Sequence, residues 1–254
     1  IMLHNADCFE VLAQLPDSSI DLVLTDPPYG IDYQLNITAK QERILPKIKN
    51  DKDSSSLDWG LFFSEVHRVL KPKKSLYMFG RLDFFLRISQ HIHSGPLKYN
   101  HDFVWSKGDM ASGNLNVFGT THELVIGLSK GTAEKSRLVT IDGEQKKRSK
   151  AFYVGKVSTK EYVGHPTQKP VGLLSYIIEN RTDPGDVVFD PFNGSGSTTL
   201  AAKLLNREWI GAELDAEYHD MATRRMSDPE IEEYYRSRLA KGFISRDGGV
   251  SLEK

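Results

Sequence analysis

The stretch LTDPPYG, residues 24–30, places an acid, two prolines and a tyrosine in four consecutive positions. Pro27 and Pro28 fix φ and carry no N–H, so the carbonyl groups around them point in set directions. The carboxylate of Asp26 and the carbonyl of Pro27 can then accept both hydrogens of an exocyclic amine, while Tyr29 offers a face for ring stacking. This set suits an aminated base turned out of its stack. An Asp-capped turn with a core tyrosine would use the same residues.

A second candidate site lies in VVFDPFNGSGSTTL, residues 187–200, where a strand ends in Asp190 and a small-residue turn leads into a helix. A phosphate-binding loop would need a lysine where Gly196 stands, and a dinucleotide fingerprint would need a glycine where Thr199 stands. A nucleoside or amino-acid ligand remains, as does a tight turn without a ligand. Glu213 ends the next strand and could accept hydrogen bonds from ribose hydroxyls.

Three motifs together are more specific than either stretch alone. DPPYG (26–30) and DPFNGSGST (190–198), joined by HPTQKP (165–170), resemble the amino-directed DNA methyltransferases that use S-adenosylmethionine. Because DPPY precedes the glycine-rich turn, the order is similar to that of the circularly permuted β class. The resemblance covers residues 3–218. It implies an α/β, Rossmann-like, mostly parallel twisted sheet with an antiparallel edge hairpin.

The resemblance also assigns roles to matching residues. Catalysis would fall to Asp26, Pro27, Pro28 and Tyr29. S-adenosylmethionine would be bound by Asp7, Cys8, Asp26, Thr167, Lys169, Asp190, Phe192, Gly194, Gly196 and Glu213. In this set Asp7 and the N–H of Cys8 would meet the adenine of the cofactor, and Glu213 its ribose. Thr167 and Lys169 would approach the methionine carboxylate, with a cation opposite an anion. His165 is expected to be structural, and no metal site is expected, since there is one cysteine and no paired His spacing.

The choice of target base depends on the first position of the motif. Aspartate there resembles the adenine-N6 enzymes, whereas cytosine-N4 enzymes more often carry serine. We therefore expect methylation of N6 of a flipped-out adenine in duplex DNA. The alternatives are N4-cytosine methylation and a catalytically inactive nucleic-acid-binding module on the same fold. A nucleotide-dependent oxidoreductase is disfavoured by the missing third glycine.

Basic residues gather in two polar stretches. The first contains Lys40, Arg43, Lys47, Lys49 and Lys52, and the second contains Lys146, Lys147, Arg148 and Lys150. Such clusters are usually solvated loops, but in a DNA-binding enzyme they would contact phosphates with an affinity that falls steeply with salt. We expect residues 31–56 to form a mobile DNA-contacting loop and residues 131–164 a small target-recognition arm.

The pattern of apolar runs indicates how these motifs are positioned. Short strand-like runs alternate with helical patterns, which is typical of a parallel α/β sheet. Strands are expected at 21–26, 75–80, 187–191 and 207–215, with an antiparallel edge pair at 101–107 and 122–130, and helices at 57–70, 169–181, 193–206 and 229–241. The expected organisation is a catalytic half (1–130), the arm (131–164), a cofactor-binding half (165–226) and a C-terminal helix and tail (227–254).

Bulk composition is that of an ordinary globular protein. Hydrophobic residues make up 39% of the 254 and charged residues 26%, and the net charge of −1 gives no global attraction to nucleic acid. The single cysteine, Cys8, excludes an internal disulfide framework and fits a reducing cytoplasm. No run is apolar enough for a membrane span or a signal core. We expect a cytoplasmic protein, bacterial, archaeal or phage-encoded, whose partners are double-stranded DNA, a second copy in a homodimer and a restriction endonuclease acting on the same site.

Overall fold

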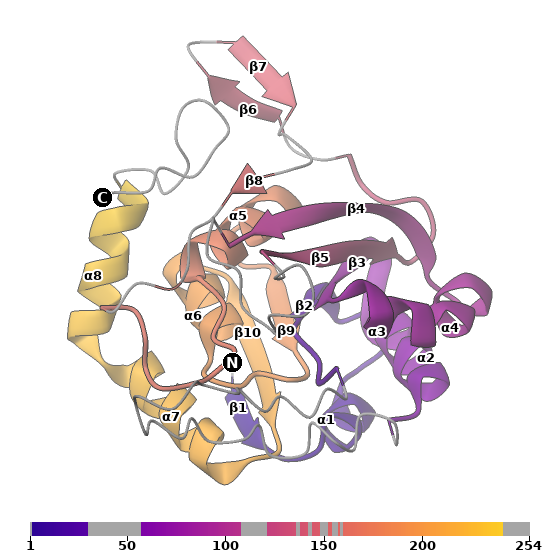
Figure 1. Cartoon of the computed structure of the whole chain (residues 1–254), viewed down its shortest axis with the longest axis horizontal. Helices are drawn as coiled ribbons and strands as arrows, with labels where there is room; N and C mark the ends of the chain where they lie inside the picture. Colours follow the sequence, from indigo (N-terminus) through magenta and orange to yellow (C-terminus); the bar gives the residue numbers. More distant parts are fainter. Residues whose placement is uncertain are drawn as a thin grey trace, which may run out of the picture.

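The computed structural model describes residues 2–29, 57–107, 121–135, 138–141, 144–147, 152–153, 157 and 160–240. Within them a central sheet is flanked by helices on both faces (Figure 1). In spatial order its strands are β1 (Met2–Asn5), β10 (Glu208–Glu213), β9 (Val187–Asp190), β2 (Ile20–Thr25), β3 (Leu70–Gly80), β5 (His122–Ser129), β4 (Lys98–Ser106) and β8 (Phe152–Tyr153). The helices are α1 (Cys8–Gln14), α2 (Trp59–Val69), α3 (Leu82–Arg87), α4 (Ser89–Ser94), α5 (Val171–Arg181), α6 (Ser197–Leu204), α7 (Ala216–Ser227) and α8 (Pro229–Ala240).

The strand directions confirm the expected class of fold. From β1 to β3 all neighbours are parallel, whereas β5 is antiparallel to both β3 and β4. The predicted antiparallel pair is therefore present, but it is not the outermost element, because the two residues of β8 pair in parallel with β4 beyond it. A separate hairpin of β6 (Leu138–Ile141) and β7 (Glu144–Lys147) lies inside the predicted arm, above the sheet in Figure 1.

The core has two halves, one on each face of the sheet. In β2 the side chains of Leu22 and Leu24 pack on the α5 and α6 face, while that of Val23 packs on the α1 and α2 face. All three are completely buried. Successive side chains of a strand point to opposite faces, so a strand covered on both faces must be apolar throughout. This is why the DLVLT run shows no polar alternation.

Helix α2 follows the sequence prediction closely. Trp59, Phe62, Phe63 and Val66 form its buried face, and the side chain of Asp58 caps it by accepting from the N–H of Leu61 at 2.9 Å. The KPKK segment, however, does not separate this helix from the next strand.

Instead, β3 begins directly at Leu70. The register of β3 against β2 shifts between Ile20 and Leu22, so the extra residues of KPKK are accommodated as an irregularity in the ladder. Pro72 has no N–H to contribute there, and Lys73 adopts a φ of 68°. Helices α1, α3, α4 and α7 had no counterpart in the sequence-based prediction.

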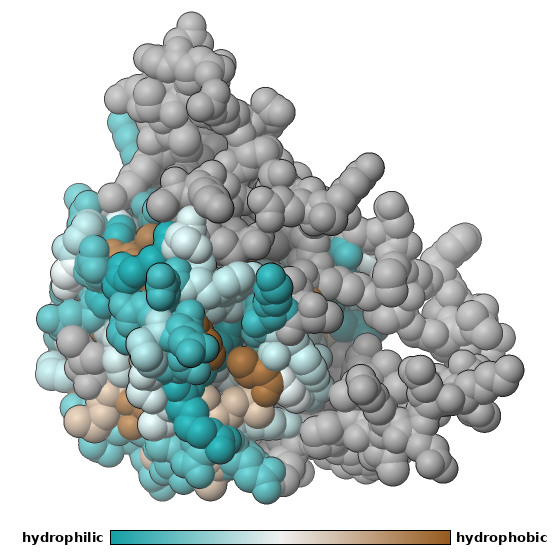
Figure 2. All heavy atoms as spheres, turned by 90° about the vertical axis from the view of Figure 1, so that its left-hand side faces the viewer, coloured by the Kyte–Doolittle hydropathy of each residue, from teal (hydrophilic) through white to brown (hydrophobic). Residues whose placement is uncertain are grey.

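The face that carries α7 and α8, on the left of Figure 1, is largely hydrophilic where it is described, with only small hydrophobic areas (Figure 2). Helix α8 contributes charged side chains there, including Glu230, Glu233 and Arg236. None of the helices built from the described residues is both long and apolar enough to cross a membrane.

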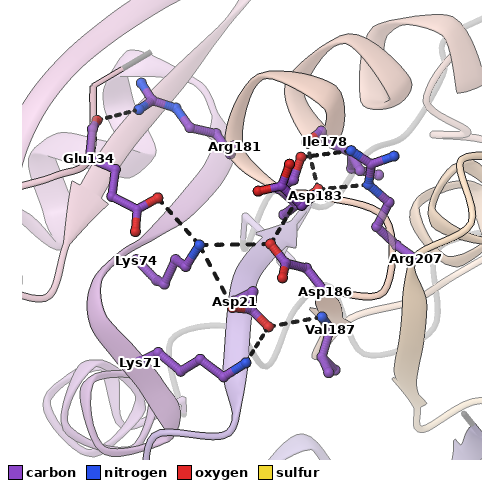
Figure 3. Close-up of polar contacts among 11 residues, drawn as sticks. Asp21, Lys71, Lys74, Glu134, Ile178, Arg181, Asp183, Asp186, Val187 and Arg207 are labelled. Atoms are coloured by element: carbon purple, nitrogen blue, oxygen red, sulfur yellow. Dashed lines mark hydrogen bonds and ion pairs between the residues drawn. The ribbon is translucent and has the colours of Figure 1, made fainter. Parts of the chain in front are cut away.

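A group of charges ties together the amino ends of three strands (Figure 3). We call Asp21, Lys71, Lys74, Glu134 and Asp186 the amino-end cluster. The ammonium of Lys71 lies 2.6 Å from Asp21 Oδ2, and Lys74 Nζ lies 3.7 Å from Asp21 Oδ1, 3.3 Å from Glu134 and 3.7 Å from Asp186. The N–H of Val187 also donates to Asp21 Oδ2 at 3.0 Å. Asp21 is 3% exposed, so its carboxylate depends on these protein partners rather than on water.

Candidate active site

The predicted site residues meet where parallel strands end. The carboxyl ends of β1, β10, β9 and β2 are neighbours at one edge of the sheet, which is where ligands bind in open α/β folds. Backbone bonds hold the segments after these strands together: Ala6 N donates to Glu213 O at 3.1 Å, and Asn193 N to Ala212 O at 2.8 Å. The hydroxyl of Thr25 donates to Asp190 Oδ1 at 2.7 Å. Segments far apart in the sequence thus form one continuous surface.

Asp26 follows the last residue of β2 and is engaged on both carboxylate oxygens. The hydroxyl of Tyr29 donates to Oδ1, and the ammonium of Lys169 donates to Oδ2. Burial raises the pKa of Asp26 above its ordinary value, and the Lys169 charge only partly opposes this. Its side chain is nevertheless 20% exposed, so an incoming donor can reach it. Pro27 is buried and Pro28 half-buried, which leaves this segment little freedom.

Tyr29 is held from two sides. Its ring centroid lies 5.2 Å from that of Phe84 in α3, at an interplanar angle of 38°, and its carbonyl accepts a hydrogen bond from Arg87. The residue is half-buried, so part of it faces solvent beside Asp26. A rigidly supported aromatic ring next to a carboxylate is what stacking of a flat polar substrate needs.

Lys169 is almost fully buried, at 6% exposure, and lies between two carboxylates. Besides Asp26 its ammonium is 3.3 Å from Glu123 Oε2, and Lys107 pairs with Oε1 of the same glutamate. We call Asp26, Lys169, Glu123 and Lys107 the Asp26 cluster. Burial lowers the pKa of Lys169, but the charges of Asp26 and Glu123 outweigh it, so the net shift is upward and the residue stays an ammonium. Sequence reasoning placed Lys169 at this site but missed Glu123 and Lys107.

The glycine-rich turn is shaped by two left-handed residues. Gly194 has a φ of 50° and Gly196 a φ of 77°, conformations that residues with a side chain rarely adopt. A Cβ on Gly196 would lie 3.0 Å from the Cβ of Ala222 in α7, so the turn also depends on close packing. The carboxylate of Glu213 fixes this turn by accepting from Gly194 N at 2.7 Å and from Asp215 N at 2.9 Å. Burial raises the pKa of Glu213.

Asp190, the last residue of β9, stabilises the start of the turn through hydrogen bonds. It is 3% exposed and accepts from Thr25 and from the N–H of Phe192 at 3.1 Å. Burial raises its pKa to about 6 despite these hydrogen bonds. Phe192 itself is half-buried and packs on Phe62 of α2 with ring centroids 5.7 Å apart.

His165 packs against the same turn. A Cβ on Gly194 would meet its Nε2 at 3.1 Å, and its ring centroid lies 4.4 Å from that of Tyr218. Burial, together with the charges of Lys169 and Arg225, lowers the pKa of His165 to about 4, so the imidazole is neutral near pH 7. These contacts agree with the structural role expected for it. Thr167 is half-buried next to it, with Oγ1 at 3.5 Å from His165 Nδ1.

The remaining cofactor candidates follow β1. Asp7 caps α1 by accepting from Phe9 N at 2.8 Å, and it is half-buried at the same edge as Glu213. Cys8 is buried, and burial raises the pKa of its thiol to about 12. A thiol with such a pKa is not a nucleophile near neutral pH.

Beneath the glycine turn lies a buried guanidinium. Arg225, in α7, donates from Nη1 to Ser195 O at 3.2 Å and to Ser197 Oγ at 2.8 Å. Its Nη2 donates to the hydroxyl of Tyr235 in α8 at 3.0 Å. Arg225 is 2% exposed. It therefore links the turn to the last helix of the described chain.

The predicted DNA-binding residues are only partly within reach of the structure. Lys40, Arg43, Lys47, Lys49, Lys52, Arg148 and Lys150 lie outside the described residues. Lys146 and Lys147 belong to strand β7, for which the backbone path alone is described. Their contact with DNA stays a prediction.

The family model for DNA methylases of the N6/N4 type matches residues 20–224, a span that contains all three motifs. The chain belongs to this DNA methylase family. It is 29% identical over 242 residues to the type II methyltransferase M.HinfI of Haemophilus influenzae, covering 88% of this chain and 67% of that protein. To M.BglII of Bacillus subtilis it is 28% identical over 261 residues, covering 89% and 68%.

Solved structures show the same fold. The complex of M1.HpyAVI with SAM matches this methylase with a TM-score of 0.65 at 24% identity, over 89% of this chain and 99% of that one. The PvuII DNA methyltransferase, which is cytosine-N4-specific, matches with a TM-score of 0.70 at 22% identity, over 99% and 95%. At these identities the likeness establishes the Rossmann-like methyltransferase fold and leaves the target base to be argued from the site.

Proposed function

We propose that this DNA methylase transfers a methyl group from S-adenosylmethionine to N6 of a flipped-out adenine in duplex DNA. The observation that carries the proposal is the position of Asp26. Its carboxylate stands directly after β2, accessible to solvent, beside a supported aromatic ring and next to the glycine-rich turn. An acceptor and a stacking surface are thus joined at the edge where a nucleoside ligand is expected.

The residues at this edge fit S-adenosylmethionine. At the strand ends Asp7, Phe192, Gly194 and Glu213 are half-buried and so partly accessible, whereas Asp190, Asn193 and Ser195 are buried. Each oxygen of Glu213 accepts one N–H in this structure and has a second lone pair for a ribose hydroxyl. Asp7 and the backbone of Cys8 would bind the adenine, Thr167 and Lys169 the methionine carboxylate, and the Gly194 to Gly196 turn the chain between them.

The chemistry divides between the cofactor and the protein. When bound, S-adenosylmethionine would supply an electrophilic methyl group on a sulfonium, whose sulfur would leave as a neutral thioether. Asp26 and the Pro27 carbonyl accept the two hydrogens of the target amine, which localises the nitrogen lone pair for in-line attack. The nitrogen becomes positively charged, and the Asp26 carboxylate stabilises that charge and receives the proton afterwards. Tyr29 stacks on the extruded base, which offsets part of the few kcal/mol that flipping costs.

DNA binding completes the proposal. The two basic stretches would bind phosphates, and the arm at 131–164 would read the target sequence. A homodimer, a restriction endonuclease acting on the same site, and a cytoplasmic location for a bacterial, archaeal or phage-encoded protein are further parts of the proposal. Its relatives M.HinfI and M.BglII, which are type II methyltransferases of bacteria, support the endonuclease and a bacterial source.

The test is to incubate the protein with S-adenosylmethionine and genomic DNA from a strain without methylases, digest the DNA, and identify modified nucleosides by mass spectrometry. N6-methyldeoxyadenosine is the expected product, and it should be absent with Asp26→Ala. N4-methyldeoxycytidine instead would support the alternative base. Binding of DNA without either product would support an inactive module.

A further inference from the structure

Glu123 is a buried acid that no motif of the sequence includes. It is the second residue of β5, paired in register with Trp105 of β4, and its side chain is 11% exposed. Its Oε1 pairs with Lys107. Its Oε2 lies 3.3 Å from Lys169 Nζ and, among the described residues, makes no hydrogen bond. A buried carboxylate oxygen is therefore aimed at the ammonium that also contacts Asp26.

Assuming the methyl transfer proposed above, we propose that Glu123 is a positioning residue of this reaction. It shares the Lys169 ammonium with Asp26, so that Asp26 keeps its capacity to accept from the target amine and the three groups together keep one net negative charge.

The surroundings make this sharing effective. Lys169 Nζ lies 5.4 Å from the ring centroid of Phe79 and 5.8 Å from that of Trp105, so water is largely excluded and charges act strongly. The ammonium has three hydrogens, and it reaches Asp26, Glu123 and, at 3.5 Å, the carbonyl of Thr167. The ammonium of Lys169 is therefore shared among three acceptors and is not paired with Asp26 alone.

Charge balance gives the reason why the reaction needs Glu123. An isolated pair of Asp26 with Lys169 is neutral and would do little for a nitrogen that becomes cationic. Asp26, Lys169 and Glu123 together carry a charge of −1, and Lys107, which pairs with Glu123 through a side chain that is 26% exposed, offsets only part of it because solvent screens its charge. The net negative charge of Asp26, Lys169 and Glu123 would thus stabilise the cationic nitrogen that forms beside Asp26.

The pKa values support the same arrangement. Burial raises the pKa of Asp26 most, and the charge of Lys169 opposes this. The negative charge of Glu123 has the next largest effect and raises the pKa of Asp26 further. The pKa of Glu123 itself is lowered, because Lys169 and Lys107 together outweigh its burial. The other groups that face Asp26 are the Tyr29 hydroxyl and the carboxyl of Asp190, whose pKa the Asp26 charge helps to raise.

The deciding experiment follows the titration of Asp26 by ¹³C NMR of carboxyl-labelled protein without cofactor, with Asp26→Asn to assign the signal. Glu123→Gln removes a negative charge and should move the titration of Asp26 to lower pH, while Glu123→Asp, which keeps the charge, should leave it near that of the wild type. Lys107→Gln removes the opposing cation and should move it to higher pH. Glu208→Gln and Lys98→Gln, exposed at the ends of β10 and β4, are the matched controls that should not move it.

The same variants are then assayed for methylation. Glu123→Gln should lower kcat by about 10- to 100-fold with the KM for S-adenosylmethionine changed less, and the acid limb of its pH–rate profile should move to lower pH. A lower kcat with an unmoved limb and an unmoved NMR titration would mean that Glu123 only stabilises the fold, which overturns the inference. Because the NMR titration needs no turnover, an absence of methylation by the wild type would count against the proposed function alone. Should Glu123→Gln not fold, the half-exposed Lys107 still decides the question, and an unmoved titration in Lys107→Gln would overturn the inference.

Discussion

Strand β2 carries a lysine-paired aspartate at each end, and the two differ in what surrounds them. Near the amino end, Asp21 is 3% exposed and takes two lysines and a backbone N–H (Figure 3). After the carboxyl end, Asp26 is 20% exposed and shares a single lysine with a second carboxylate. Asp21 contacts two ammonium groups directly, whereas Asp26 contacts one and shares it. The first arrangement closes an ion pair inside the fold, and the second leaves a carboxylate in need of a further positive partner.

The largest expected effect is at the carboxyl end. Asp26→Asn keeps the shape of the side chain but removes its charge, so methyl transfer should fall by about 10³-fold or more. Cofactor binding, followed by isothermal titration calorimetry, should persist because the glycine turn and Glu213 are untouched. Turnover near the wild-type level would remove Asp26 from the mechanism.

The corresponding change at the amino end should affect stability and leave the chemistry intact. Asp21→Asn removes the carboxylate that pairs with Lys71 and Lys74. Because Lys71 is 39% exposed and Lys74 keeps Glu134 and Asp186, the cost should be about 2 kcal/mol, less than for a fully buried pair. Urea unfolding measures this loss, and kcat at a temperature where the variant is folded should match that of the wild type. A fall in kcat as large as that of Asp26→Asn would erase the distinction between the two ends.

A smaller effect is expected in the dependence of stability on pH. The pKa of His165 is lowered to about 4 in the folded state, so its contribution is present above about 6.5 and is lost as the pH falls through 4. Asp190 acts in the opposite sense, because its pKa is raised to about 6: its contribution is present below about 4 and is lost as the pH rises through 6. The two largely cancel in the wild type.

Replacing His165 should therefore leave the pH dependence of stability that is due to Asp190. On going from pH 7.5 to pH 4.5 the wild type loses the contribution of His165 to its unfolding free energy, whereas His165→Asn has no such contribution to lose. Relative to the wild type, the variant should therefore be about 2 kcal/mol more stable at pH 4.5 than at pH 7.5, as measured by urea unfolding at both pH values. His93→Asn, at an exposed position of α4, is the control. Parallel pH profiles for His165→Asn and the wild type would show that folding does not lower the pKa of His165.

The smallest effect compares two glycines at the two edges. Gly196 (φ 77°) is in the turn at the carboxyl ends, and Gly185 (φ 86°) is in the turn before β9 at the amino ends. Alanine at Gly185 meets no atom within 4 Å, so it should cost about 1 kcal/mol from backbone strain alone. Alanine at Gly196 adds the contact with Ala222 at 3.0 Å and should cost measurably more in thermal unfolding. Equal losses of stability in the two variants would show that α7 shifts enough to accommodate the new methyl group without a measurable cost.

The sequence was sufficient for features that are local. The apolar run of β2, the buried face of α2 and the glycine turn each follow from residues close together in the chain, and the motif order predicted the permuted fold. The Asp26 cluster was not accessible in the same way, since Asp26 and Lys169 are 143 positions apart and Glu123 reaches Lys169 only because β5 inserts between β3 and β4. An acid at the start of an apolar strand was the one available signal for Glu123. The KPKK segment misled because an irregular strand and a turn have the same composition.

The buried guanidinium of Arg225 has a consequence for how the protein can be shortened or fused. It is bonded both to the glycine turn and to Tyr235, so α8 acts as a foundation for the cofactor-binding edge although it lies at its periphery. A truncation that removes α8 should weaken binding of S-adenosylmethionine even though none of the residues proposed to bind it belongs to that helix. In hydrogen exchange, the amides of the turn and of α8 should open together as a single cooperative unit. Tags or partner domains are therefore better joined after α8 than in place of it.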